Sequence, residues 1–257
     1  MTAPRPLPEE VFCLACGPDV PLRRDPRAPV LQCPRCGDSV PVPALPLFVV
    51  TGASGAGKTT IAVLLRGLLP DCDVFEVDLT LQVAALGWET WRDTWLRLAH
   101  AVALNGRVSV LCGSLLPDQL ESVPARRLLG PIHFCNLDCP DDVLAARLRA
   151  RPSWRHGSVE TTIANHQRFA AWLRAHIQPS WDTSELTPGE AAGRVAAWVQ
   201  DLLPDGGRPR SPEFCSRNII DLRNFYLPTI DSGKRNTLSA RNSACLAGPR
   251  KAARRDN

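Results

Sequence analysis

A glycine-rich run that ends in Lys-Thr carries the clearest chemistry in this sequence. The motif G-x-x-x-x-G-K-[ST] is matched at every fixed position, by the residues Gly52, Ala53, Ser54, Gly55, Ala56, Gly57, Lys58 and Thr59. The backbone N–H groups of such a loop close around phosphate oxygens, its lysine reaches the β- and γ-phosphates, and its threonine hydroxyl can ligate Mg²⁺. The sequence therefore predicts that a nucleoside triphosphate binds at residues 52–60, with Thr60 in the first helical turn, and that Thr59 holds magnesium.

Two Cys-x-x-Cys pairs near the start of the chain have the spacing of a metal site. They are separated by sixteen residues, and each second cysteine precedes a glycine: Cys13, Cys16, Cys33 and Cys36. Four thiolates can surround Zn²⁺ tetrahedrally, which predicts a zinc ribbon over residues 11–40. So small a module has almost no core, so metal binding would supply most of its folding free energy.

These chemical groups need elements to position them, and from Leu47 onward strand-like and helix-like segments alternate. The pattern predicts an α/β protein with a five-stranded parallel sheet in a three-layer P-loop fold, whose ligands gather at the carboxyl ends of the strands. The expected strands are Leu47–Thr51, Val74–Val77, Val108–Cys112, Ile132–Leu137 and Gln178–Trp181. The expected helices are Thr59–Leu69, Trp88–Leu104, Pro117–Leu128, Asp141–Ala150, Val159–His176 and Pro188–Leu202.

Charge and composition suggest four regions. Residues 1–10 are expected to be disordered, 11–40 form the ribbon, and a proline-rich connector leads into a domain over 45–203. Residues 205–257 carry eleven Lys or Arg against five Asp or Glu, a net charge of +6, which leaves −2 for residues 1–204 out of the total of +4. We therefore expect residues 204–257 to form a disordered basic tail. Its composition also fits an extension that comes from an expression vector or a frame shift.

The expected cellular compartment is inferred from two kinds of apolar segment that the sequence does not show. No apolar stretch approaches the roughly 20 residues that span a bilayer, and residues 1–10 lack the apolar segment of a signal peptide. The remaining cysteines of the domain lie in apolar, strand-like segments, where a reduced thiol behaves as a small hydrophobic group. These features predict a cytoplasmic protein with no membrane partner.

Four features in a fixed order make the domain resemble a known family. The phosphate loop is followed by Asp78 after the second strand, by Arg147-Leu148-Arg149-Ala150-Arg151, and by Asp182-Thr183-Ser184 before a helix that starts with Pro188. In this order they resemble the small P-loop kinases, which include nucleoside monophosphate, gluconate and shikimate kinases and chloramphenicol phosphotransferase. The resemblance covers about Leu45 to Leu203 and implies an ATP- and Mg²⁺-dependent kinase domain.

The resemblance also implies roles for single residues. Asp78 would bind Mg²⁺ or accept the proton of the acceptor hydroxyl, although a helix N-cap is the alternative reading of this residue. Arg147 would pack over the adenine and Arg151 would contact phosphate, with Arg155 joining them when the lid closes, and Thr183 would help to bind the nucleotide. Planar guanidinium groups suit the charge on a transferring phosphoryl group, although the same arginines would also suit an exposed helix face.

The acceptor pocket is marked more weakly. The third strand ends in Cys112-Gly113-Ser114, where the resemblance suggests that the backbone approaches the acceptor, and Gly113 would permit that approach. Arg92 is a further candidate on a helix that also carries Trp88, Trp91 and Trp95, a stripe that also fits the core.

Two absences narrow the functional class. The third strand ends without the aspartate that motor-type ATPases use for Mg²⁺, and the guanine-reading sequence N-K-x-D is not present. We therefore expect a phosphotransferase that moves the γ-phosphate of ATP to a small-molecule hydroxyl or to a nucleotide phosphate. The alternative is a nucleotide-binding regulatory or nucleic-acid-binding ATPase, which would contact nucleic acid through the zinc ribbon or the basic tail. The identity of the acceptor and the oligomeric state do not follow from the sequence.

Overall fold

The computed structural model describes residues 11–151 and 159–203. Its centre is a sheet of five parallel strands in the order β10-β9-β6-β8-β7. The strands are β6 (Leu47–Gly52), β7 (Cys72–Glu76), β8 (Val108–Cys112), β9 (Ile132–Asp138) and β10 (Ser180–Asp182). Every residue of β6 is buried because this strand lies in the middle of the sheet with both faces covered.

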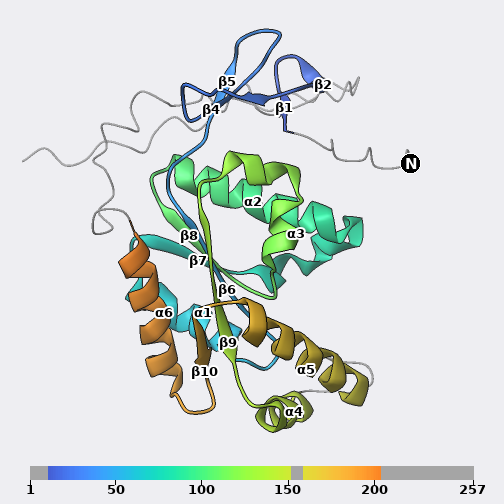
Figure 1. The fold of residues 1–257 in the computed structure, drawn as a ribbon, viewed down its shortest axis with the longest axis vertical. Coiled ribbons are helices and arrows are strands. Elements are labelled where there is room, and N and C mark those ends of the chain that lie inside the picture. Colours follow the sequence, from blue (N-terminus) through green and yellow to red (C-terminus); the bar gives the residue numbers. More distant parts are fainter. Residues whose placement is uncertain (1–10, 152–158, 204–257) are drawn as a thin grey trace, which may run out of the picture. The chain divides into compact units, whose positions relative to one another are not determined.

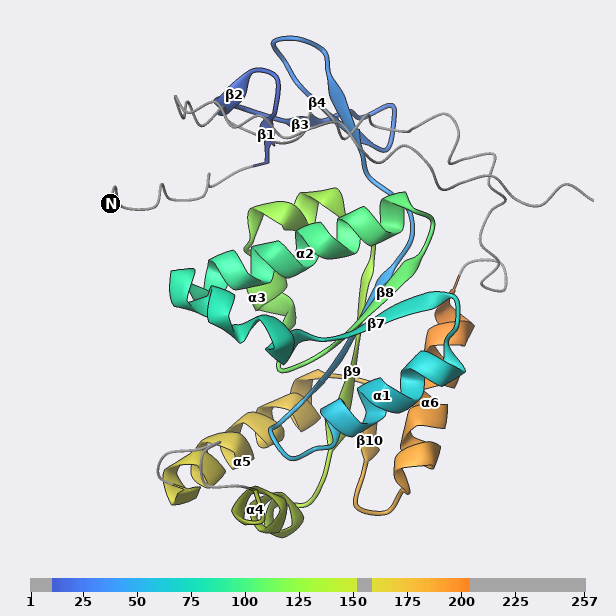
Figure 2. The same ribbon diagram turned by 180° about the vertical axis from the view of Figure 1, so that it is seen from behind.

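Helices cover both faces of the sheet (Figures 1 and 2). One face packs against α1 (Lys58–Leu68) and α6 (Pro188–Leu202), and the other against α2 (Trp88–Leu104), α3 (Pro117–Glu121) and the 3-10 helix η2 (Pro124–Leu128). Side chains alternate along β6 accordingly, with Leu47 and Val49 in one core and Phe48 and Val50 in the other. A third core joins α4 (Asp141–Arg149) to α5 (Val159–His176). The predicted three-layer α/β fold is thus confirmed.

Three of the predicted elements differ from the structure by more than one residue, and one of them is the last strand, which spans Ser180–Asp182 and not Gln178–Trp181. The helix expected over Pro117–Leu128 is interrupted at Val123, which is extended (φ −89°, ψ 146°) because the ring of Pro124 disfavours a helical residue before it. The second strand ends at Glu76 and not at Val77, and the chain continues into an unpredicted 3-10 helix, η1 (Val77–Leu86). This helix carries Asp78 in its first turn.

The four cysteines belong to a small β module. It contains β1 (Phe12–Cys13), β2 (Gly17–Pro21), β3 (Arg23–Arg24), β4 (Val30–Gln32) and β5 (Ser39–Pro41), arranged as a two-stranded and a three-stranded antiparallel sheet. We call residues 11–42 the cysteine module. Its buried residues join the core that lies beneath α2 and η2.

Two polar contacts also connect the cysteine module to the helices below it. A guanidinium N–H of Arg127 donates to the carbonyl oxygen of Leu22 at 2.8 Å, and Nε2 of the buried His100 lies 2.9 Å from the carbonyl oxygen of Pro41. The module therefore packs on the sheet domain through both apolar and polar groups.

Three predictions lie outside the described residues: the disorder of residues 1–10, the basic tail over 204–257, and the position of Arg155. Within residues 11–151 and 159–203, no helix has the length and apolar character needed to cross a membrane.

Candidate active site

The predicted phosphate loop joins β6 to α1 at the carboxyl end of the sheet. Gly52 fits this position because a Cβ there would lie 2.6 Å from the carbonyl oxygen of Leu137 on β9. Lys58 turns back over the loop, and its amine donates to the carbonyl oxygens of Gly52 (2.7 Å) and Ala53 (2.9 Å). Thr59 and Thr60 are exposed in the first turn of α1. The loop therefore has the strand-to-helix setting that phosphate binding requires.

The amine of Lys58 is held in a poorly hydrated place, although part of its side chain is accessible. Burial lowers its pKa to about 8, the carboxylate of Asp78 opposes this shift, and the guanidinium of Arg151 adds to it. A phosphate at the loop would favour the charged amine, as an anion next to a lysine does. Its attraction for phosphate is therefore greatest below about pH 8, where the amine is protonated.

Glu76 is a site residue that the sequence reasoning missed. The hydroxyl of Thr59 donates to Oε1 of Glu76, the last residue of β7. Glu76 lies beside Cys112 in the register of β7 and β8, next to the strand end where the expected ATPase aspartate is absent. A carboxylate and a hydroxyl are the oxygen ligands that Mg²⁺ prefers, so these two residues together could hold the ion. The sequence signal for Glu76 is an acid inside the expected strand Val74–Val77, two residues before Asp78.

Asp78 lies two residues further on, exposed in the first turn of η1. Its charge acts on Lys58, which places it at the same end of the sheet as the phosphate loop. It follows the end of β7 by two residues and does not belong to the strand. Asp78 and Glu76 thus bring two carboxylates to the loop where the sequence predicted one.

Arg147 lies between the phosphate loop and the Thr183 segment. Its guanidinium donates to the carbonyl oxygen of Gly55 (3.2 Å) and to the hydroxyl (3.0 Å) and carbonyl (3.0 Å) oxygens of Thr183. The Thr183 hydroxyl also lies 3.0 Å from the carbonyl oxygen of Ala56 and 2.9 Å from that of Asp138. These contacts bring Arg147 and Thr183, two of the predicted nucleotide-binding residues, to the phosphate loop.

Arg151 also reaches the loop. Helix α4 ends at Arg149, yet Arg151 remains close enough for its Nη1 to donate to Oγ of Ser54 at 2.7 Å. Two of the three predicted arginines therefore meet the phosphate loop in the structure. They bring positive charge to the place where a triphosphate would carry negative charge.

The candidate acceptor residues have different surroundings. Ser114 donates its hydroxyl proton to the carbonyl oxygen of Gly52 at 3.0 Å. The space beside Gly113 is occupied by the fully buried Val77, since a Cβ at Gly113 would lie 1.9 Å from Cγ2 of Val77. Arg92 is half-buried on α2, with its Nε enclosed and without a hydrogen-bond partner among the described residues. Of the tryptophans around it, Trp91 and Trp95 are core residues, whereas Trp88 is 56% exposed.

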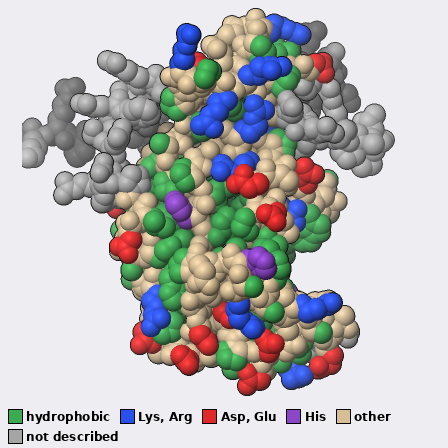
Figure 3. Space-filling view, viewed as in Figure 1, with side chains coloured by type: hydrophobic (Ala, Val, Ile, Leu, Met, Phe, Trp, Pro, Cys, Tyr) green, Lys and Arg blue, Asp and Glu red, His purple; other side chains and the backbone are tan. Residues whose placement is uncertain are grey.

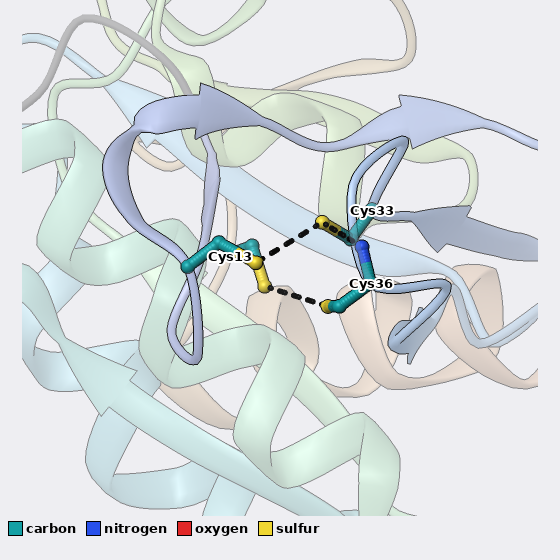
Figure 4. A group of neighbouring side chains, drawn as sticks. Cys13, Cys33 and Cys36 are labelled. Carbon is teal, nitrogen blue, oxygen red and sulfur yellow. Dashed lines mark hydrogen bonds between the residues drawn. The ribbon is translucent and has the colours of Figure 1, made fainter.

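The four cysteines of the module form one cluster. Their sulfur atoms all lie within 4.8 Å of one another, with 3.6 Å between the Sγ atoms of Cys13 and Cys36 and 3.8 Å between those of Cys16 and Cys33. Figure 4 shows the thiols of Cys13, Cys33 and Cys36 directed toward one another. A tetrahedral zinc with Zn–S bonds of about 2.3 Å separates its sulfurs by about 3.8 Å. The cluster therefore has the dimensions of a zinc site.

The turn around Cys33 stabilises the thiolate form of this cysteine. Burial opposes the charge, but the N–H groups of Cys36 and Arg35 both donate to Sγ of Cys33 and lower its pKa to about 6. Metal ligation requires the thiolate form, so this hydrogen bonding favours binding.

No protein-family model and no curated protein matches this chain, but several solved structures do. The tunicamycin resistance protein of Deinococcus radiodurans is 24% identical with a TM-score of 0.47, covering 60% of this chain and 95% of its own. A sugar kinase from Janibacter sp. is 21% identical (TM-score 0.45, covering 60% and 94%), and the shikimate kinase of Acinetobacter baumannii, solved with shikimate, is 17% identical (0.43, covering 61% and 94%). The description of the fold rests on the strand order and on the loop described above.

Proposed function

We propose that this chain is an ATP- and Mg²⁺-dependent phosphotransferase that moves the γ-phosphate to a small-molecule hydroxyl or to a nucleotide phosphate. The observation that carries the proposal is the pair of carboxylates beside the phosphate loop. Glu76 accepts the Thr59 hydroxyl, and Asp78 lies close enough to influence Lys58. A protein that only binds a nucleotide needs the loop, whereas transfer to a hydroxyl also benefits from a group that receives the acceptor's proton.

Each residue has a task that follows from its position. Lys58 and the loop N–H groups hold the donor phosphates, and Arg147 and Arg151 supply positive charge from the other side of the loop. Thr59 and Glu76 would hold Mg²⁺, which neutralises charge on the phosphates when it is bound. Asp78 would orient an acceptor hydroxyl and take its proton. Gly113 belongs to this site indirectly, because it makes room for Val77 between the two acids.

A screen for acceptors tests the proposal. The full chain is incubated with ATP and Mg²⁺ and with nucleosides, nucleotides, sugars and hydroxylated antibiotics, and ADP formation is measured. We expect one class of acceptor to stimulate ADP formation, Lys58→Ala to abolish it, and Asp78→Asn to lower kcat by about 10²- to 10⁴-fold while ATP binding changes little.

The matched control is Asp201→Asn, which removes an exposed carboxylate from the last turn of α6 and should leave the rate unchanged. Phosphate transfer by Asp78→Asn at the wild-type rate would show that the role assigned to Asp78 is wrong. Failure of every acceptor to stimulate ADP formation would count against the phosphotransferase as a whole.

A second function is favoured by the surface of the cysteine module. Figure 3 shows basic side chains gathered over it, and Arg23, Arg24, Arg27 and Arg35 are exposed there. In the regulatory alternative, this module would contact RNA or DNA and ATP would act as a switch. Such binding would weaken steeply with salt, because each neutralised phosphate releases counterions. If binding of RNA or DNA by the chain did not depend on salt concentration, the phosphotransferase would be the better explanation.

A further inference from the structure

Ser54, the third residue of the phosphate loop, is held from two sides. Arg151, which follows α4, donates to its hydroxyl oxygen at 2.7 Å. Its backbone N–H donates to Nδ1 of His166 at 3.4 Å, and His166 lies in the middle of α5. Ser54 is therefore contacted by two groups far from it in sequence, of which only Arg151 is among the predicted site residues.

The N–H of Ser54 belongs to the kind of group that binds phosphate in such a loop. Backbone N–H groups of the loop close around phosphate oxygens, and each can serve one strong acceptor at a time. In the structure the acceptor at Ser54 is the imidazole nitrogen of His166. His166 thus lies where the loop would otherwise present an N–H to an anion.

The charges around His166 also suit an anion. Burial lowers its pKa, and the nearby cations Lys58, from the start of α1, and Arg151, from the end of α4, lower it further. The imidazole is therefore neutral near pH 7, in agreement with its role as an acceptor. The carboxylates Asp138 and Asp141, on the elements packed against α5, are engaged by Arg174. A phosphate beside Lys58 and Arg151 would reverse this balance and favour a protonated imidazole.

We propose that His166 is a further ligand of the donor phosphates, which releases the Ser54 N–H to a phosphate oxygen and then donates a hydrogen bond to the bound phosphates itself. The inference rests on the proposed function, since it needs a nucleoside triphosphate at the loop. In this role His166 takes up a proton when the nucleotide binds. A purely structural role, in which His166 only anchors α5 to the loop, involves no such proton.

The variant His166→Asn separates these roles. Its side-chain oxygen can accept the Ser54 N–H at the position of Nδ1, but its amide cannot be protonated. The matched control is His176→Asn on the same helix, where His176 stacks on the ring of Trp172 and its Nδ1 contacts the carbonyl oxygen of that residue in the preceding turn, away from the phosphate loop. Thermal unfolding of both variants establishes that they are folded, and His166→Gln is a second variant if His166→Asn is not.

ATP binding with Mg²⁺ is measured by calorimetry on the full chain at pH 6 to 8, in pairs of buffers with different ionisation enthalpies. We expect His166→Asn to bind ATP about tenfold more weakly than wild type near pH 6.5, as loss of one charge-assisted hydrogen bond implies. We also expect wild type and His176→Asn to take up more protons on binding than His166→Asn does.

Equal affinity and equal proton uptake in wild type and His166→Asn would overturn the inference while leaving the proposed function in place. Absence of ATP binding by the wild-type chain would overturn both. Near pH 6.5 the amine of Lys58, whose pKa is about 8, is already mostly protonated, so it adds little proton uptake of its own to the comparison.

Discussion

The acid that meets the phosphate loop most directly is Glu76. Its side chain accepts a hydrogen bond from the hydroxyl of Thr59, so a loop hydroxyl and a nearby carboxylate, the two groups expected in a magnesium site, are already in contact. Asp78 then remains available for the acceptor, since no contact with Thr59 occupies it among the described hydrogen bonds. Two carboxylates with separate tasks are consistent with a site that handles both a metal and a proton.

Replacing Glu76 by Gln tests this division at the scale of one residue. The amide still accepts a hydrogen bond from Thr59 but has lost the negative charge that attracts Mg²⁺. We expect the Mg²⁺ concentration for half-maximal activity to rise about tenfold, since one charge-assisted contact is worth about 1.5–3 kcal/mol. ATP binding in the absence of Mg²⁺ should change little.

Activity titrated with Mg²⁺ checks this expectation. Glu121→Gln, which changes an exposed glutamate of α3 that pairs with Arg126, is the control and should keep the wild-type magnesium dependence. An unchanged magnesium titration for Glu76→Gln would remove Glu76 from the metal site.

At the scale of elements, the end of β8 positions the two acids through a close packing contact. The side chain of Val77, between Glu76 and Asp78, fills the space left by the missing Cβ of Gly113. The expected role of Gly113 was backbone approach to the acceptor, whereas its observed contact is with Val77. The absence of a side chain at Gly113, just after β8, therefore allows the junction of β7 and η1 to pack against this strand end.

The variant Gly113→Ala should push Val77 away and displace both acids. We expect kcat to fall about 10- to 100-fold, because small misplacements of catalytic groups are costly, with ATP affinity nearly unchanged. The overpacked variant should also lose about 1–3 kcal/mol in free energy of unfolding. Steady-state kinetics and urea unfolding measure the two effects.

The double variant Gly113→Ala with Val77→Ala provides the control, because the smaller side chain restores room for the new methyl group. We expect it to recover most of the lost activity, although Val77→Ala by itself costs about 2 kcal/mol of stability. Strictly additive losses in the double variant would refute the packing explanation.

At the scale of the whole described molecule, the cysteine module and the sheet domain share one apolar core. Residues such as Leu22 and Leu31 of the module belong to the same cluster as Trp91 and Leu96 of α2. The contact of Arg127 with the carbonyl oxygen of Leu22 adds a polar link. Folding of the module should therefore support the helices on this face of the sheet.

Metal analysis and thermal unfolding test this coupling. We expect about one zinc per chain, lost in Cys13→Ser, and a fall of several degrees in Tm on zinc removal, since each kcal/mol is worth about 2–4 °C at this size. The control Cys72→Ala removes a buried thiol outside the cluster and should keep its zinc. A purified chain without zinc, or zinc retained by Cys13→Ser, would contradict the assignment.

Local sequence patterns were sufficient to predict several features of the structure. The phosphate loop and the four cysteines depend on residue types at short spacings, and α2, α5 and α6 have the predicted bounds because apolar periodicity and their end signals lie within each segment. The α6 start is an example, where Thr187 and Glu190 form a capping box. The interruption of the expected helix at Pro124 was missed although its signal was also local.

The sequence by itself thus determined the phosphate loop, the cysteine cluster and the α/β class, since each is encoded by neighbours along the chain. Only the tertiary structure decided that Glu76 meets Thr59, that Gly113 receives Val77, and that His166 contacts Ser54. These pairs join residues 17, 36 and 112 positions apart. Their contacts follow from strand order, register and helix packing, which no local pattern of residues specifies.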